Sequence, residues 1–436
     1  MNKKLQSVLS VVLLLVCGLC LFTSCASEKL DFYSNIESSL GVVAKLVRAM
    51  HGWIGNYGWT VVVFTVFLKI VMLPLDFWQR YASRKATLKS KKMQPLLAAI
   101  DKRYGANTQR AQEEKAKLYK KNGGTGMGGM CLPMIVSMVV FFIMFGGLRD
   151  YSNYLSVKQF KELSHTYYDT CITQLRGEEG NPFAEQFASY DSKMAAITDD
   201  DSEANKALKA KMEVVSDVFK YADKSGNAEL TAKCDAATQN AVKAVQDYYV
   251  EHKQSWLWIQ NVGQPDTWQP IMPSYNDAGD SNSIATIVNT DTFSGGKELY
   301  NTIRNAVLAT GGYGDNGSWN GLLILPVLSI ALSFLSMFIS QKMESRNRKG
   351  DETPVADSQT AQQQAMTNKT MMIIMPLMMA YFGFLYTGAF AIYMVCNYAI
   401  SILSTVALRV PVEKAVTKSL DKAEQKENGG KASYMR

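Results

Sequence analysis

The feature that most constrains this fold is a series of apolar runs, each close in length to the hydrocarbon core of a bilayer. A helix needs about 20 apolar residues to cross that core. Five runs after the N-terminal leader meet this requirement: 57–77, 130–148, 322–339, 371–386 and 389–408. The mean hydropathy of -0.07 hides them, because a long polar stretch separates the second run from the third. The sequence therefore predicts an all-α membrane protein with five spans.

The first 24 residues have the pattern of a secretory signal peptide. Two lysines near the start precede an apolar run over 9–21, and a charged start followed by such a run is typical of a cleaved leader. A small residue directly before Cys25 resembles a bacterial lipobox, which predicts lipidation of Cys25. Ordinary cleavage beside that cysteine is the alternative.

The distribution of charge predicts the orientation of the spans. Residues 78–121 carry 13 Lys and Arg against three acids, whereas residues 150–320 carry 24 acids against 14 bases. Basic loops stay in the cytoplasm, so the N-terminus and 150–320 are expected outside and the C-terminus inside a bacterial cell membrane. The net charge of +7 is then an orientation signal and not a sign of nucleic-acid binding.

These signals divide the chain into eleven parts. They are the signal peptide (1–24), an extracytoplasmic amphipathic helix (25–54), span one (55–77), a cytoplasmic helical hairpin (78–129), span two (130–148), an inserted and mainly helical extracytoplasmic domain (149–320), span three (321–340), a cytoplasmic loop (341–369), spans four (370–387) and five (388–408), and a cytoplasmic tail (409–436).

Local patterns refine two of these parts. Apolar residues from Ile36 to Ile54 recur on one helical face, which predicts a helix lying on the membrane surface. In the basic hairpin, the first arm is expected to be interrupted at Pro95, and Asn107 or Thr108 can cap the second arm. The inserted domain shows helical patterning over 183–222 and 228–254, followed by a stretch with little periodicity.

No pattern of residues predicts catalysis or a cofactor, so an enzyme is not expected. The three histidines lack ligand spacing, and the glycine-rich segment 123–129 lacks the Gly-Lys-Ser/Thr ending of a phosphate-binding loop. That segment is interpreted as a joint before span two. Cys171 and Cys234 share the inserted domain, where one disulfide is possible.

Lys69 is the residue that does not fit its surroundings. It lies near the middle of span one, where a lysine costs about 3 kcal/mol by insertion scales. The other four spans contain no Asp or Glu, so its expected partner is water or a visiting anion. The alternative is that its side chain reaches toward the headgroups.

Four polar residues of the spans could line a hydrated cavity around Lys69. They are Thr65, Ser137, Tyr393 and Asn397. Ordinary hydrogen bonding between helices is the alternative role for each of them.

Several motifs, in order along the chain, resemble the YidC/Oxa/Alb-type membrane protein insertase family. They are Trp53 to Trp59, Leu73 to Leu75, Lys92 to Pro95, Lys102 to Tyr104, Lys117 to Gly123, Gly128 to Pro133, Trp256 to Ile259, Gln264 to Asp266, Met372 to Pro376 and Gly388 to Asn397. They cover most of the chain outside the inserted domain.

The resemblance implies a five-helix core with a groove open to the cytoplasm and the lipid. It also implies that Lys69 holds the place of the family's intramembrane cation, which is usually arginine. Ser137 stands where the family usually has glutamine, and Tyr393 where it has tryptophan. The implied substrates are nascent membrane proteins, and the implied partners are the ribosome, the Sec translocon and membrane lipids, with no cofactor.

Two other functions remain open from the residues alone. Lys69 could serve as the anion site of a transporter or channel, although no internal repeat supports this. The chain could also be a lipoprotein adaptor whose inserted domain is the active part.

Overall fold

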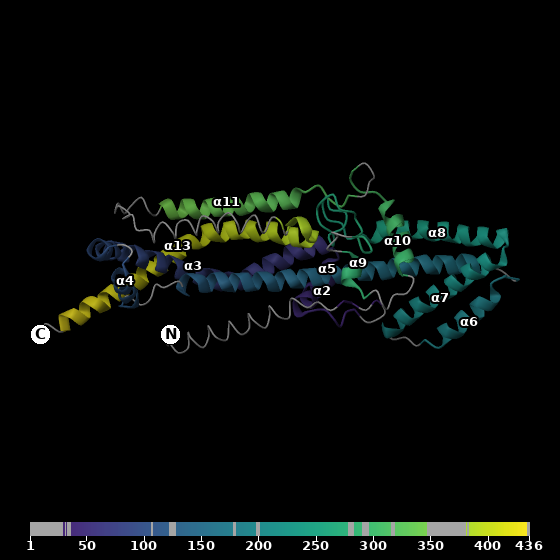
Figure 1. Cartoon of the computed structure of the whole chain (residues 1–436), viewed down its shortest axis with the longest axis horizontal. Coiled ribbons are helices and arrows are strands. Elements are labelled where there is room, and N and C mark those ends of the chain that lie inside the picture. Colours follow the sequence, from purple (N-terminus) through teal and green to yellow (C-terminus); the bar gives the residue numbers. More distant parts are fainter. Residues whose placement is uncertain are drawn as a thin grey trace.

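The computed structural model is elongated and its described residues contain helices and no strands (Figure 1). The structure describes residues 29–30, 32, 36–105, 108–121, 128–177, 180–197, 201–277, 283–289, 296–314, 319–346, 381 and 383–433. The helices are α2 (Val42–Ile54), α3 (Tyr57–Tyr104), α4 (Gln109–Lys121), α5 (Gly128–Arg176), α6 (Ala184–Ala195), α7 (Asp201–Ser225), α8 (Ala228–His252), α9 (Ile284–Ile287), α10 (Gly296–Leu308), α11 (Ile324–Arg346) and α13 (Gly388–Ser433).

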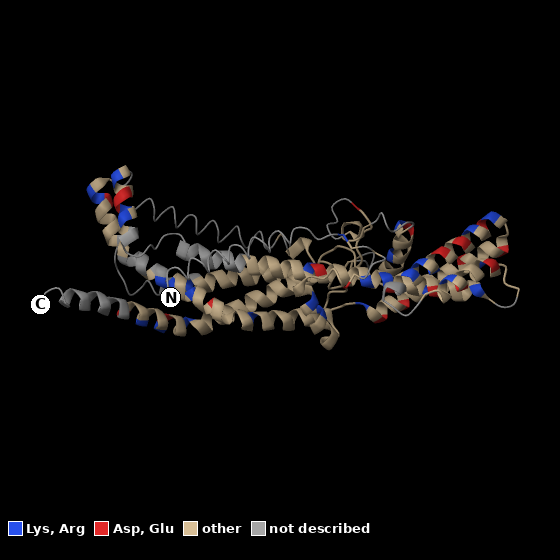
Figure 2. Ribbon diagram, turned by 90° about the horizontal axis from the view of Figure 1, so that it is seen from below, with Lys and Arg blue, Asp and Glu red and all other residues tan. Residues whose placement is uncertain are grey.

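Charge separates the molecule into zones along its long axis. Figure 2 shows Lys, Arg, Asp and Glu gathered at the two ends, with a middle zone that is mostly uncharged. Within the described residues, two helical segments are long and apolar enough to cross a membrane, Tyr57–Lys85 and Gly388–Asp421, and Ile324–Ser340 is a shorter apolar helix. The described part of the chain thus confirms an all-α fold and contains two candidate membrane spans.

Three helices extend well beyond the expected spans. α3 continues from span one through the first arm of the basic hairpin, α5 continues from span two far into the inserted region, and α13 continues through the tail. The expected interruption at Pro95 is wrong, because α3 contains both Pro74 and Pro95. A proline removes one backbone hydrogen bond and can bend a helix without ending it.

The basic hairpin turns at Gly105, whose φ of 79° lies in the left-handed region. The hydroxyl of Thr108 accepts the N–H of Ala111 at 3.2 Å, so the prediction that Thr108 caps the second arm is confirmed. Asn107 lies outside the described residues. An ion pair between Lys115 and Asp101 at 2.5 Å joins α4 to α3.

The amphipathic helix is shorter than expected. α2 begins at Val42 because Gly41 is extended, and Ile36 to Ser39 instead form a turn. Ala44 and Val47 are buried against the rest of the protein, whereas Trp53 is 93% exposed. Gly55, with φ 76°, ends the helix, and the Asn56 side chain then caps α3 by accepting the N–H of Trp59.

The inserted region is a helical domain built on the distal half of α5. α8 packs along α5, and α6, α7 and α10 complete the bundle. The predicted helical stretches correspond to α6, α7 and α8. Cys171 and Cys234 are both free and buried, and burial raises the pKa of the Cys171 thiol to about 12.

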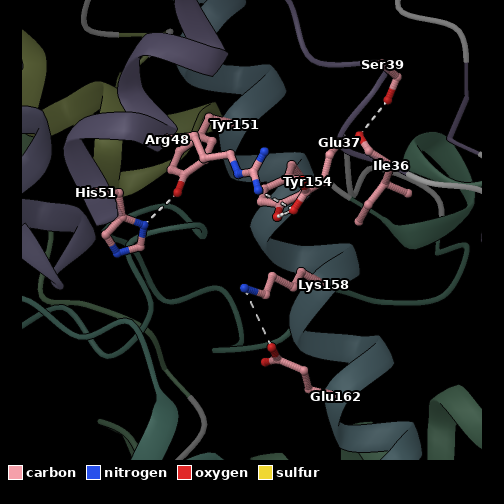
Figure 3. A network of polar contacts seen from close by, with 9 residues as sticks. All are labelled: Ile36, Glu37, Ser39, Arg48, His51, Tyr151, Tyr154, Lys158 and Glu162. Carbon is pink, nitrogen blue, oxygen red and sulfur yellow. Dashed lines mark hydrogen bonds and ion pairs between the residues drawn. The ribbon is translucent and has the colours of Figure 1, made fainter. Parts of the chain in front are cut away.

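A polar network fixes α2 to the base of this domain (Figure 3). The His51 Nδ1 and the Tyr151 hydroxyl lie 2.6 Å apart. Arg48 pairs with Glu37 at 2.5 Å, and Glu37 also accepts the hydroxyl of Tyr154 at 3.0 Å. Burial, reinforced by the charge of Lys158, lowers the pKa of His51 below its ordinary 6.5.

Candidate functional site

The candidate site lies where α3 and α13 pack against each other. The Lys69 Nζ donates a hydrogen bond to the Ser401 hydroxyl at 3.0 Å. Lys69 is half-buried, and it lies about 18 Å along the helix axis from Tyr57 at 1.5 Å per residue. In the part of the chain that the structure describes, no carboxylate lies within ion-pair distance of its amine. The Ser401 hydroxyl carries no charge, so this contact does not neutralise the ammonium group of Lys69.

The structure places three of the other predicted site residues on these two helices. Thr65 lies one turn before Lys69 and is fully buried, with its hydroxyl donated to the carbonyl of Val61 at 2.7 Å. Asn397 lies one turn before Ser401 and is half-buried, and Tyr393 lies one turn earlier and is buried. Lys69 and Asn397 therefore share the packing seam of α3 and α13.

The remaining predicted residues lie outside this description. The backbone of Ser137 belongs to α5, but its side chain is not among the described ones. Cys25, the signal peptide, the glycine-rich joint and most of span four also lie outside the described residues.

Sequence reasoning missed the partner of Lys69. Ser401 is four residues after Asn397, so the same helical spacing that joins Lys69 to Thr65 could have identified it. The two pairs, Thr65 with Lys69 and Asn397 with Ser401, then face one another across the seam.

A second set of polar contacts continues the seam toward the basic hairpin. The guanidinium of Arg84 binds both carboxylate oxygens of Glu413, each at 3.0 Å. Arg80 donates to the Ser404 hydroxyl at 3.4 Å, and Lys85 donates to the hydroxyl of Ser419 at 2.8 Å. The bidentate pair fixes the extended part of α13 to α3, which explains why the helix does not end where its apolar residues end.

The opposite face of α3 is apolar and uncovered. It carries Trp59, Val63, Val66, Phe67, Ile70, Val71 and Leu73, all of which are exposed. Exposed apolar residues at helical spacing are expected on the face that a span presents to lipid. Lys69 thus lies on a helix with one face on α13 and the other open.

The ends of the helices opposite the basic hairpin meet at the loop 253–277. Gly388 and Ala389 at the start of α13 donate backbone N–H groups to the carbonyls of Gln264 and Val262. The Asn320 amide donates to three carbonyls of the same loop, at 2.8 to 3.0 Å. The loop therefore holds the start of α13 in place.

Asp266 of this loop caps the start of α11. Its carboxylate is completely buried and accepts the N–H groups of Leu322 at 2.9 Å and Leu325 at 2.7 Å. It also accepts the indole N–H of Trp258 at 3.1 Å. A buried carboxylate at a helix N-terminus, with three donors, is a strong local anchor.

Comparisons with known proteins agree with the motifs. The chain is 37% identical over 109 residues to the membrane protein insertase YidC of Caldanaerobacter subterraneus subsp. tengcongensis, a segment that covers 25% of this chain and 50% of that protein. It is 37% identical over 99 residues to the membrane protein insertase YidC of Dechloromonas aromatica, covering 23% of this chain and 17% of that protein. The similarity thus spans half or less of these relatives. No solved structure matches the chain.

A family model described as 60Kd inner membrane protein matches residues 49–216 and 241–415. The matched residues include α3, α5, α11 and α13 through Ala415, and therefore both partners of the Lys69–Ser401 contact. The unmatched segment between them, 217–240, is the distal tip of the helical domain. This chain therefore belongs to the 60Kd inner membrane protein family, the family of the YidC-type insertases.

Proposed function

We propose that this protein is a membrane protein insertase and chaperone that acts through a hydrated, positively charged groove beside Lys69. The observation that carries the proposal is the Lys69–Ser401 contact at 3.0 Å. A lysine in the middle of a span is costly unless water or an anion reaches it. Its partner among the described residues is a neutral hydroxyl, so an arriving carboxylate can replace that partner with a stronger, charge-assisted bond.

The proposed topology places the basic hairpin and the end of α13 in the cytoplasm and the helical domain outside. This follows from the charge distribution and agrees with the uncharged middle zone of the molecule (Figure 2). Lipidation of Cys25 would add a second anchor at the outer surface, weaker than the spans themselves.

In the proposed mechanism, the basic hairpin receives a nascent membrane protein from the ribosome or beside the Sec translocon. The acidic extracytoplasmic segment of the substrate enters the groove from the cytoplasm and is attracted by Lys69. Asn397 and Ser401, which are half-buried, keep the groove wet, and Thr65 and Tyr393 lie buried on the same two helices. The apolar helix of the substrate then moves into lipid beside the groove, driven by the burial of its apolar surface.

Lys69 tests this mechanism directly. Losing one charge-assisted contact is worth about 1.5–3 kcal/mol, which is about tenfold or more in rate or occupancy. We expect Lys69→Ala and Lys69→Glu to reduce insertion of a single-span substrate with an acidic tail by at least that factor, in cells depleted of the native insertase. Lys45→Ala is the control, because Lys45 is an exposed lysine of α2 that the proposed mechanism does not use.

Normal insertion by the Lys69→Glu variant would refute charge capture. A photocrosslinker at position 69 supplies the independent readout, and it should capture the arriving substrate rather than a resident protein. Flux of a small anion through the purified protein in liposomes, blocked by Lys69→Ala, would instead support the anion channel.

A further inference from the structure

A strained two-residue hairpin lies beside the start of α3. Trp256 and Ile259 exchange two backbone hydrogen bonds, each of 2.9 Å, so Leu257 and Trp258 form the turn. Leu257 has φ 50°, in the left-handed region that favours glycine. Hairpin turns of this length normally place Gly, Asn or Asp at a position with positive φ. The chain therefore holds a leucine where a leucine is conformationally unfavourable.

The described residues do not bury this leucine. The Leu257 side chain is 63% exposed, although its neighbours in the hairpin are fixed on both sides. Ile259 is completely buried, and the indole of Trp258 is tied to Asp266. Contacts with the rest of the protein thus fix the base of the hairpin, and only its apolar tip, Leu257, is exposed.

The base of the hairpin is locked to the start of α3. Asn56 donates to the carbonyl of Ser255 at 2.8 Å, and the Trp59 and Trp256 rings meet edge to face at 5.6 Å between centroids. A Cβ added at Gly58 would lie 2.2 Å from the indole ring of Trp256, so this side chain packs directly on the α3 backbone where only glycine leaves room for it. The hairpin and the start of α3 therefore move together as one rigid unit.

The exposed tip continues the apolar open face of α3. That face begins at Trp59, which is 50% exposed and contacts Trp256, and it proceeds through Val63 and Phe67 toward Ile70. In Figure 1 the loop lies at the same level along the long axis as the starts of α11 and α13. An apolar tip at that level, continuous with a face presented to lipid, meets the boundary between headgroups and acyl chains, where tryptophans are enriched.

We propose that the 256–259 hairpin is a lipid-binding wedge, in which Leu257 inserts into the outer leaflet beside Trp59. Burial of the exposed Leu257 side chain in the bilayer offsets the strain of its backbone. Because Gly58 admits no gap between hairpin and span, the wedge also sets the depth of α3 in the membrane. This inference rests on the proposed topology, in which α3 spans the membrane with its start on the outer side, and it is independent of what Lys69 binds.

The depth of the tip can be measured with a fluorescent probe. The full chain, with its other cysteines replaced by serine or alanine, carries the probe on Leu257→Cys in vesicles of phosphatidylcholine and phosphatidylglycerol. We expect quenching by shallow spin-labelled lipid to exceed that by deep spin-labelled lipid. Iodide quenching should be about fivefold weaker than at an aqueous site, because interfacial groups lie about 5–10 Å into the boundary.

Two positions calibrate the measurement. Tyr221→Cys, near the distal end of α7 and exposed, gives the aqueous limit, and Val63→Cys on the open face of α3 gives the lipid limit. Hydroxyl-radical footprinting of the unmodified protein in the same vesicles needs no variant, and should show Leu257 protected relative to Tyr221. Iodide access at 257 equal to that at 221 would overturn the proposal. Protection without quenching by lipid, or a disulfide between two copies at position 257, would assign the tip to a protein partner and also overturn it.

Discussion

Replacing Asp266 with alanine is expected to release the start of α11 while leaving the rest of the chain folded. The carboxylate is completely buried and accepts three hydrogen bonds, from Leu322, Leu325 and Trp258. A buried donor left without a partner costs about 1–3 kcal/mol. The N–H of Leu325 is buried and the other two donors are partly buried, so we expect a total loss of about 3 kcal/mol, or roughly 100-fold in a local opening equilibrium.

Hydrogen exchange of the protein in nanodiscs measures this loss where it occurs. Peptides covering 319–326 should exchange roughly 100-fold faster in Asp266→Ala, whereas peptides from α8 should be unchanged. Asp266→Asn should lie between the two, because its amide retains one acceptor oxygen. Asp277→Ala is the control, since Asp277 is an exposed carboxylate of the same loop.

The result that refutes the reasoning is a change of less than threefold at 319–326 in Asp266→Ala. The loop would then be held by Asn320 and the backbone contacts to α13 alone. Equal acceleration in α8 and α11 would show global unfolding, and would contradict the assignment of the carboxylate to a local anchor.

Two further variants test the attachment of α2. Gly147→Ala places a Cβ about 2.3 Å from a methyl group of Val43, which is β-branched and cannot turn away. This overpacking should lower the free energy of unfolding by about 1–3 kcal/mol. The double variant with Val43→Ala should recover part of that loss. A Gly147→Ala variant as stable as the native protein would show that α2 is not tightly packed there. The lowered pKa of His51 means that the docked state disfavours its protonated form, so docking is fully stable above pH 6.5 and weakens as the pH falls below it. Exchange in α2, corrected for intrinsic rates, should rise between pH 7.5 and 5.5 in the native protein and stay flat in His51→Gln; an equal rise in both would exclude His51 as the cause.

The sequence was sufficient for the features that depend on one helix at a time. Apolar length predicted α3 and α13, local spacing predicted the helices of the inserted domain, and hydroxyl chemistry predicted the Thr108 cap. A charge inside an apolar run is unusual whatever its neighbours in space are, so Lys69 could be identified from the sequence alone. These properties are local, so they can be read from consecutive residues.

Contacts between distant segments could not be obtained in this way. Ser401 lies 332 residues from Lys69. Helical spacing from Asn397 could mark Ser401 as a candidate, but it could not show that Lys69 contacts it. The hairpin turn at Leu257 could not be predicted either, because leucine is an unexpected residue for a positive φ. The helix ends were misjudged at Pro95, where α3 continues through the proline, and at Gly41, where an extended glycine makes α2 begin later than the apolar spacing indicates.

The continuity of α5 links the membrane to the far end of the helical domain. From Leu148 to Arg176 the helix has no break, and this segment is about 42 Å long at 1.5 Å per residue. It therefore acts as a lever arm: a tilt of span two by about 5° would carry its far end through about 3.7 Å, a displacement worked from that length. A substrate that pushes the spans apart would in this way move the far end of the helical domain. The substrate and that end of the domain need not touch.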